Sequence, residues 1–293
     1  SSLVTGVQTC ALPIWMSESK PVIFRSSANP TLRHLIRMRD NRSRRKANRV
    51  LVDGWRETSQ AILAGLELCG VYVPESLILG KNDEFQPSID LVMRYAEGHK
   101  KLNWVADALM EKISYGQSSR GVVAEFVRPM ASLKSFDLSE NSLILILDCI
   151  EKPGNVGAVF RSADAAGVDA ILLCQCVDQY NPNSIRSSLG TVFQIPSFEG
   201  TEPELRDYLV SRGIKIYAAR VESSQTLWEC DLKGPTAIIL GSEAIGLKQR
   251  WLPRPEAAID GICIPMSGKA DSLNISTSTA ILSFEAARQR SAT

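Results

Sequence analysis

Three glycine-containing loops hold most of the side chains in this sequence that could bind a ligand or catalyse a reaction. They span residues 151–161, 241–247 and 264–277, and each follows a short apolar run. Such runs are typical of strands that are buried on both faces of a parallel sheet. Ligands in these sheets bind at the carboxyl ends of the strands. We therefore expect the three loops to converge on one site, although they lie far apart in the chain.

The first loop carries Asn155 and Arg161. Asn155 is well placed to cap the helix that follows it, and Arg161 would lie between one and two turns farther along that helix. A helix cap and a surface arginine would explain this loop equally well. Its glycines, Gly154 and Gly157, are too sparse for the GxGxxG turn of a dinucleotide site, and the sequence contains no GK[ST] of a P-loop.

The second loop places Glu243 between Gly241 and Gly246, directly after an apolar run. A carboxylate that follows a buried strand is costly to desolvate unless it has a partner, and Arg161 is the candidate partner. The alternative is a glutamate near the N-terminus of a helix, where the helix dipole favours a negative charge.

The third loop carries Ser272 and Asn274 ahead of a helical segment. Capping would explain one serine or asparagine at that place. It does not explain so many small and polar residues on both sides of Leu273. Considered together, the three loops indicate a functional site far more specifically than any one of them does alone.

The elements that would position these loops alternate between strands and helices. In the first part of the chain we expect strands at residues 49–53, 71–73, 102–105 and 121–127, and helices at 55–64, 89–97 and 107–113. After a polar linker we expect strands at residues 143–148, 170–174, 214–219, 236–240 and 262–264, and a helix at 156–166. This alternation predicts an α/β fold with a mainly parallel sheet, and the sheet alone suggests a Rossmann-like topology.

Composition narrows the class of protein. A length of 293 residues favours two domains. The seven cysteines are odd in number and include no CxxC pair, which favours reduced thiols in a cytoplasmic protein. With only two histidines a zinc site has little support, so we expect no metal. No apolar run is long enough for a membrane span, so we expect no membrane partner.

Basic residues are concentrated in one segment, although the net charge of the chain is only +1. Residues 33–49 include eight Lys or Arg residues and a single acid, Asp40. Like charges three or four residues apart destabilise a helix unless something opposes them, and a nucleic acid would provide that opposition. A solvated helix face is the alternative. The candidate nucleic-acid contacts are Arg33, Arg37, Arg42, Arg44 and Arg45, together with Arg186, for which a plain surface arginine is the alternative.

The three loops resemble the three motifs of the SpoU/TrmH branch of the SPOUT methyltransferases. The matching segments are NVGAVFRSADAAG, ILGSEAIGL and IPMSGKADSLNISTSTAILSFEAAR, in the family's order. The segment RVLVDGWRETSQAILAG is similar to the opening strand and helix of the RNA substrate-binding domain that often precedes this catalytic domain. We therefore expect an RNA-binding domain at residues 17–128, a linker at 129–142 and a SPOUT domain at 143–293. Residues 1–16 are expected to be a non-native or disordered leader.

The resemblance implies a C-terminal parallel sheet with a deep trefoil knot, and a homodimer in which both subunits shape each active site. It also implies an RNA 2′-O-ribose methyltransferase that uses S-adenosylmethionine and acts on structured RNA, with ribosomal RNA favoured over tRNA. The cofactor would be held mainly by backbone groups around Leu240, Gly241, Ile264, Met266 and Leu273. No metal is required.

In this family the arginine that corresponds to Arg161 is proposed to assist removal of the proton from the 2′-hydroxyl. A free guanidinium has a pKa above about 12 and is a poor base. Arg161 could act as the base with help from an RNA phosphate, or it could stabilise the developing oxyanion and clamp that phosphate. The resemblance implies that four further side chains orient the arginine, the substrate and the cofactor; these are Asn155, Glu243, Ser272 and Asn274.

Three rival interpretations stay open at this point. One is a catalytically silent RNA-binding or assembly protein with the same fold. Another is the same chemistry on tRNA, and a third is an antibiotic-resistance enzyme that modifies one ribosomal nucleotide. A dinucleotide-dependent oxidoreductase is disfavoured because the sequence lacks the glycine fingerprint.

Overall fold

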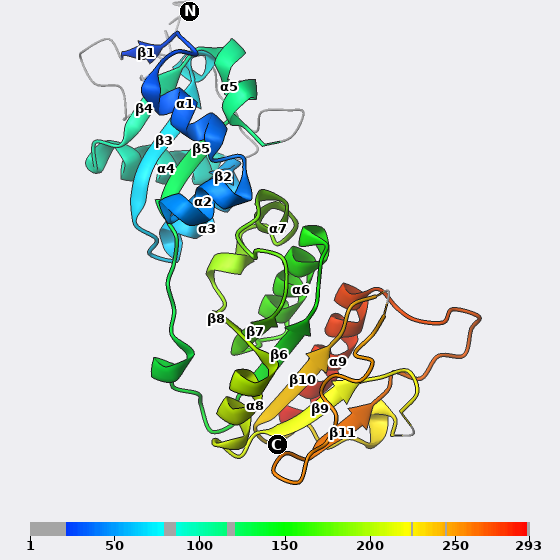
Figure 1. The fold of residues 1–293 in the computed structure, drawn as a ribbon. Coiled ribbons are helices and arrows are strands. Elements are labelled where there is room, and N and C mark those ends of the chain that lie inside the picture. The colour runs from blue at the N-terminus through cyan, green and yellow to red at the C-terminus, as the bar shows by residue number, and fades with distance from the viewer. Residues whose placement is uncertain (1–21, 79–85, 116–120, 224, 244, 292–293) are drawn as a thin grey trace, which may run out of the picture.

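The computed structural model describes residues 22–78, 86–115, 121–223, 225–243 and 245–291. These residues form two sheets, one from each half of the chain, which lie end to end in Figure 1. The leader expected at residues 1–16 lies outside the described residues.

The N-terminal sheet has five strands in the order β1-β4-β3-β5-β2, and β5 runs antiparallel to both of its neighbours. Its strands are β1 (Ile23–Phe24), β2 (Arg49–Asp53), β3 (Leu68–Pro74), β4 (Leu102–Val105) and β5 (Val123–Val127). Its helices are α1 (Pro30–Arg37), α2 (Asn41–Ala47), α3 (Trp55–Leu63), α4 (Gln86–Gly98) and α5 (Asp107–Ile113). Buried side chains of α1 and α5 share one apolar cluster against the sheet, and those of α3 and α4 share another.

The C-terminal sheet has six strands, all parallel, in the order β11-β9-β10-β6-β7-β8. Its strands are β6 (Leu143–Asp148), β7 (Ala170–Cys174), β8 (Ser197–Gly200), β9 (Lys215–Ala219), β10 (Thr236–Leu240) and β11 (Ile259–Ile262). Its helices are α6 (Pro153–Ala165), α7 (Pro182–Ser187), α8 (Glu202–Val210) and α9 (Ile275–Ser291). The expected parallel α/β fold is therefore confirmed for this half of the chain.

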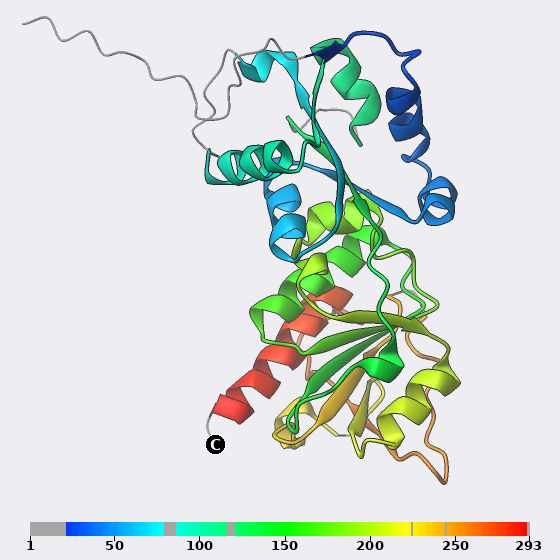
Figure 2. The same cartoon turned by 90° about the vertical axis from the view of Figure 1, so that its left-hand side faces the viewer.

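Both faces of the C-terminal sheet are buried, which explains why its central strands are continuously apolar. Along β6, Leu145 and Leu147 pack into a cluster with residues of α6 and α9, whereas Ile144 and Ile146 pack into a second cluster with α8. Figure 2 shows α6 and α9 on one side of this sheet and α8 on the other.

The strand order departs from the Rossmann topology that the alternation alone suggested. A Rossmann sheet would place the fourth strand of the unit, β9, beside the first strand, β6. Here β10 lies between them and pairs with both. The loops that follow β6 and β10 consequently emerge side by side.

Several predicted elements have the bounds that the sequence indicated, among them β2, β4, β6, β7 and β10. The strand expected at 262–264 is wrong in its bounds, because β11 covers Ile259–Ile262. The helix expected at 156–166 begins three residues earlier, at Pro153. Proline suits the first helical position, since its missing N–H would be unpaired there in any case.

The two sheets are joined by polar contacts of two arginines. Arg186 of α7 donates to the carbonyl of Tyr115 at 2.7 Å and lies 3.5 Å from the carboxylate of Asp53. Arg128, just after β5, donates to the fully buried carboxylate of Asp178 at 2.9 Å. The N-terminal sheet is thus attached to the C-terminal half by buried or half-buried pairs as well as by the chain itself.

Close packing of α6 on α7 yields a stability prediction. An added Cβ at Gly157 would collide with the Ser184 carbonyl oxygen and with Ser187 Oγ. We expect Gly157→Ala to lower the free energy of unfolding by about 1–3 kcal/mol, as overpacking does in other proteins. Urea denaturation followed by circular dichroism measures this change.

Gly154→Ala is the matched control in the same helix, because a Cβ at Gly154 would meet no atom within 4 Å. Alanine is the better helix former, so this variant should be as stable as the parent chain or slightly more stable. Equal destabilisation by both substitutions would contradict the packing argument.

Candidate functional site

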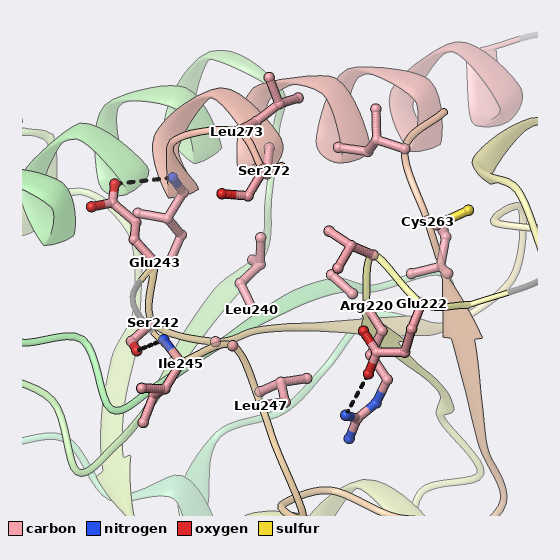
Figure 3. Close-up of a pocket in the computed structure, with 18 of the residues that line it drawn as sticks. Arg220, Glu222, Leu240, Ser242, Glu243, Ile245, Leu247, Cys263, Ser272 and Leu273 are labelled. Carbon is pink, nitrogen blue, oxygen red and sulfur yellow. Dashed lines mark hydrogen bonds and ion pairs between the residues drawn. The ribbon is translucent and has the colours of Figure 1, made fainter. Parts of the chain in front are cut away.

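A cavity of about 330 Å³ opens at the carboxyl ends of β9, β10 and β11, beneath the start of α9 (Figure 3). Four segments of the chain contribute residues to its lining. They are 219–222, 240–248 without residue 244, 262–266 and 272–278. The second and third glycine-containing loops of the sequence therefore lie together here. Ligand pockets in proteins usually have volumes of about 300–1,000 Å³.

The five residues expected to hold a cofactor all line this cavity: Leu240, Gly241, Ile264, Met266 and Leu273. Glu243 and Ser272, which were expected to take part in catalysis, line it as well. The apolar residues Leu240, Leu247 and Leu273 line the middle of the cavity, whereas its two ends carry the polar side chains of Glu243 and of Arg220 with Glu222 (Figure 3).

Gly241 is required by the shape of the loop that follows β10. An added Cβ would lie 2.5 Å from the carbonyl carbon of Gly246. The loop folds back on itself there, since the backbone N–H of Gly246 donates to the carbonyl of Ser242 at 2.8 Å. Gly246 itself has a φ of 57°, in the left-handed region that glycine tolerates best. The two glycines thus shape one wall of the cavity.

Glu243 joins all three loops. Its Oε1 accepts a hydrogen bond of 2.5 Å from Asn274 Nδ2 and one of 3.4 Å from the backbone N–H of Ile275. Its Oε2 lies 3.3 Å from the ammonium of Lys152 in the first loop. The expectation that Arg161 partners this carboxylate is wrong, because Lys152 and Asn274 occupy that role.

Asn274 also begins α9. Its Oδ1 accepts hydrogen bonds from the backbone N–H of Ser276 at 2.9 Å and from Ser276 Oγ at 2.6 Å. The same amide therefore satisfies an unpaired donor of the helix with its oxygen and holds Glu243 with its nitrogen. This arrangement places Ser272 and Leu273 over the cavity, because they immediately precede a fixed helix start.

Asn155 and Arg161 do not line the cavity. The expected capping role of Asn155 is wrong, because Lys152 is the N-cap and Asn155 lies within the first turn of α6. Arg161 is exposed, and within the described part of the chain no hydrogen bond or ion pair of its guanidinium is recorded. Arg161 comes nine residues after Lys152, the N-cap of α6. At 3.6 residues per turn, the two side chains therefore point to roughly opposite sides of the helix axis.

The fourth segment of the cavity, after β9, was not predicted from the sequence. Arg220 and Glu222 form its polar end, with Arg220 Nη1 3.5 Å from Glu222 Oε1 (Figure 3). The signal was present, since Arg220 directly follows the apolar run IYAA and Glu222 comes two residues later. It lacked the glycines that drew attention to the other loops.

Comparisons with known proteins agree with this geometry. The model of the SpoU rRNA Methylase family matches residues 142–284. The 23S rRNA (guanosine-2′-O-)-methyltransferase RlmB of Haemophilus influenzae is 31% identical over 232 residues, which are 74% of this chain and 92% of the relative.

The chain belongs to the SpoU rRNA methylase family.

Solved structures extend the likeness to nearly the whole chain. A crystal structure of an RNA 2′-O ribose methyltransferase has a TM-score of 0.77 and 36% identity, covering 92% of this chain and 99% of that one. The SpoU methyltransferase AviRb of Streptomyces viridochromogenes, solved in complex with the cofactor AdoMet, has a TM-score of 0.76 and 25% identity, with coverages of 89% and 98%.

The basic segment of this SpoU family member is largely exposed, with one exception. Arg33, Arg37 and Arg42 are exposed on α1 and α2. Arg45 is also exposed but lies 3.4 Å from Glu199. Arg44 is wrong as a nucleic-acid contact, because only 1% of it is exposed.

Arg44 and Arg186 both have internal roles instead. Arg44 donates to the carbonyls of Met38 and Arg39 at 2.8 and 2.9 Å, and burial lowers the pKa of its guanidinium. It closes the turn between α1 and α2. Because Arg186 pairs with the N-terminal half, its predicted contact with RNA would have to coexist with that pair.

The dual role of Asn274 yields a prediction about the site. Asn274→Asp keeps an oxygen that can cap α9 but places a second carboxylate against Glu243. We expect the free energy of unfolding at neutral pH to fall by about 1 kcal/mol, because a hydrogen bond is replaced by repulsion. Chemical denaturation at low salt measures this change.

A second substitution tests whether the loss comes from this contact. In the double variant Asn274→Asp/Glu243→Gln the glutamine amide can donate to the new carboxylate, so the hydrogen bond is restored with its polarity reversed. The double variant should recover most of the lost stability. Additive losses in the double variant would mean that Glu243 and Asn274 do not interact in solution.

Proposed function

We propose that this chain transfers a methyl group from S-adenosylmethionine to a ribose 2′-hydroxyl in structured RNA, with ribosomal RNA as the substrate class. The observation that carries this proposal is the cavity at the carboxyl ends of β9, β10 and β11, which is lined by the residues of the second and third family motifs. The relatives whose names specify 23S rRNA support the choice of ribosomal RNA over tRNA.

The cavity fits S-adenosylmethionine in size and chemistry. Leu240, Leu247 and Leu273 provide apolar surface for the flat adenine ring, and backbone groups near Gly241 and Ile264 are available to read its polar edge. The cofactor's charged methionine portion would find polar groups at either end of the cavity. When bound, it supplies a sulfonium methyl group to an attacking oxygen.

Transfer requires that the ribose hydroxyl lose its proton as it attacks. We assign Arg161 to this step, as the base aided by an RNA phosphate or as the cation that stabilises the developing oxyanion and clamps the phosphate. Glu243, Ser272 and Asn274 orient the reacting groups around the cavity, and Asn155 lies on the same helix as Arg161. A positioned arrangement of this kind can contribute on the order of 7–11 kcal/mol to catalysis.

We further propose that the active unit is a homodimer and that the C-terminal half carries a deep trefoil knot. Two observations support these proposals. Arg161 is exposed and lies outside its own subunit's cavity, as a residue offered to a partner's site would. The chain beyond β11 returns across the sheet to form α9, which packs against α6.

The N-terminal half is proposed to bind the RNA substrate, and the protein is proposed to act in the cytoplasm. Exposed arginines of α1 and α2 support the first proposal. The six cysteines among the described residues form no disulfide, which supports the second. Within the described ranges no helix is long and apolar enough to cross a bilayer, and no group of three or more potential metal ligands is found.

The assignment of Arg161 predicts a separation of binding from catalysis. Arg161→Ala should lower the rate of methyl transfer by about 10²–10³-fold or more, which is typical for the loss of one group that stabilises a developing oxyanion. Cofactor binding should be nearly unchanged, because Arg161 does not line the cavity. Calorimetry with S-adenosylmethionine and methyl incorporation into ribosomal RNA measure the two quantities.

Arg212→Ala is the matched control, since Arg212 is exposed and lies over the ring of Tyr208, away from the cavity. It should leave both quantities unchanged. An Arg161→Ala variant with full turnover would remove Arg161 from the mechanism.

The exposed cations predict a salt-dependent affinity for RNA. Replacing Arg33, Arg37 and Arg42 together by alanine should weaken RNA binding. Each lost phosphate contact should reduce the slope of log K against log salt by about 0.7–0.9. Fluorescence anisotropy with a ribosomal RNA fragment over a series of salt concentrations measures the slope.

Arg94→Ala serves as the control for this effect, because Arg94 is equally exposed but lies on α4, outside the basic segment. Its removal should leave the slope nearly unchanged. If the triple variant bound RNA with the parent affinity and slope, the basic segment would not be the RNA-binding surface.

A further inference from the structure

The wall of the cavity after β10 continues into residues 249–251, which do not line the cavity. Leu247 and Lys248 belong to the wall, and the backbone N–H of Arg250 donates to the carbonyl of Leu247 at 2.9 Å. An interaction that holds Arg250 in place therefore also holds Leu247 and Lys248, the last two residues of the wall.

Arg250 is held by a bidentate ion pair. Its Nε and Nη2 donate to the two carboxylate oxygens of Asp148 at 2.7 and 2.8 Å, and Nη2 also lies 3.2 Å from Cys174 Sγ. Asp148 ends β6 and its side chain is 1% exposed. Two parallel N–H···O bonds to a carboxylate fix both the distance and the orientation of the guanidinium.

A second arginine ties the same segment to β9. Arg220 Nη1 donates to the carbonyl of Lys248 at 2.9 Å, and Nη2 donates to the carbonyl of Arg250 at 2.6 Å. Arg220 itself lines the cavity. Together the two arginines connect the carboxyl ends of β9, β10 and β6, which are neighbours in the sheet.

The backbone of this segment needs such support. Lys248 and Trp251 have φ values of 44° and 55°, in the left-handed region that residues other than glycine adopt at a cost. Leu247 and Trp251 are both buried in the cluster that contains α8. The segment is therefore anchored at both ends by apolar side chains and held in a strained path between them by Arg220 and Arg250.

We propose that Arg250 and its partner Asp148 are positioning residues for the S-adenosylmethionine site, acting through Leu247 and Lys248 at the end of the cavity wall. This inference rests on the proposed function. The pair keeps the cavity wall in its binding-competent shape, so that cofactor binding does not have to order the loop. Neither residue lines the cavity, so their effect on the cofactor is transmitted through the backbone.

The proposal predicts a loss of affinity without a loss of chemistry. Arg250→Lys keeps the positive charge but cannot make the bidentate pair, and Asp148→Asn removes the charge from the other side. Each variant should raise the Kd for S-adenosylmethionine about tenfold. An effect of this size lies within the range measured for the interaction of two residues in direct contact. The kcat at saturating cofactor should stay within about twofold of the parent value, because the reacting groups are unchanged.

The experiment is titration calorimetry with S-adenosylmethionine on the full chain, beside methyl transfer to ribosomal RNA at varied cofactor concentration. Urea denaturation confirms that each variant is folded at the assay temperature. The double variant Arg250→Lys/Asp148→Asn should have a Kd for S-adenosylmethionine no higher than the higher of the two single-variant values, because the two residues act as one unit. Arg254→Lys is the matched control, since Arg254 lies three residues beyond Trp251, has a side chain that is 49% exposed and makes only a long contact of 3.9 Å with Glu202.

Each outcome is decisive. A raised Kd in both single variants, a non-additive double variant and an unchanged control support the proposal. Folded single variants with the parent Kd, a fall in kcat without a change in Kd, or an equal loss in Arg254→Lys would overturn it. If the parent chain itself did not bind S-adenosylmethionine, the proposed function would fail, and that result is distinct from a parent that binds and a variant that binds equally well.

Discussion

The C-terminal half depends on one constraint, the burial of both faces of a sheet whose six strands all run in the same direction. Parallel strands need crossover connections, so every loop that follows a strand emerges at the same edge. The order of the strands then decides which loops meet. Because β10 lies between β6 and β9, the loop with Glu243 emerges beside the loop with Lys152, which comes some ninety residues earlier, and a short ion pair forms between them.

The strength of the sequence signal follows from the same constraint. β6, β7 and β10 could be predicted to the residue because both of their faces are apolar, so the run starts and stops with the strand. β11 lies at the edge of the sheet and carries the exposed Asp260, so its sequence is not continuously apolar. The apolar run ICI therefore predicted the wrong bounds for this strand. α8 was missed although its capping box, Thr201 with Glu204, is legible in the sequence.

Convergence of the second and third loops could be predicted, but the partners of individual side chains could not. Glu243 was correctly placed beside a polar partner, yet that partner is Asn274 together with Lys152 rather than Arg161. The reason is the start of α6 at Pro153, which fixes the angular position of every later residue. Asn155 and Arg161, six residues apart, project about 120° from one another at 100° per residue. Arg44 shows the same limit, since charge alone did not reveal that α2 packs it inward.

The cavity of one chain has the size and lining to hold a cofactor, and both carboxylates that line it already have polar partners within the chain. Glu243 accepts a hydrogen bond from Asn274 and lies 3.3 Å from the ammonium of Lys152. Glu222, at the other polar end, lies beside the guanidinium of Arg220. Both carboxylates are therefore already engaged in contacts that shape the two ends of the cavity. Arg161 is exposed, and within the described ranges its guanidinium makes no hydrogen bond or ion pair, so an RNA phosphate can reach it. In the proposed mechanism, the substrate RNA or a second copy of the chain therefore has to bring Arg161 together with the bound cofactor.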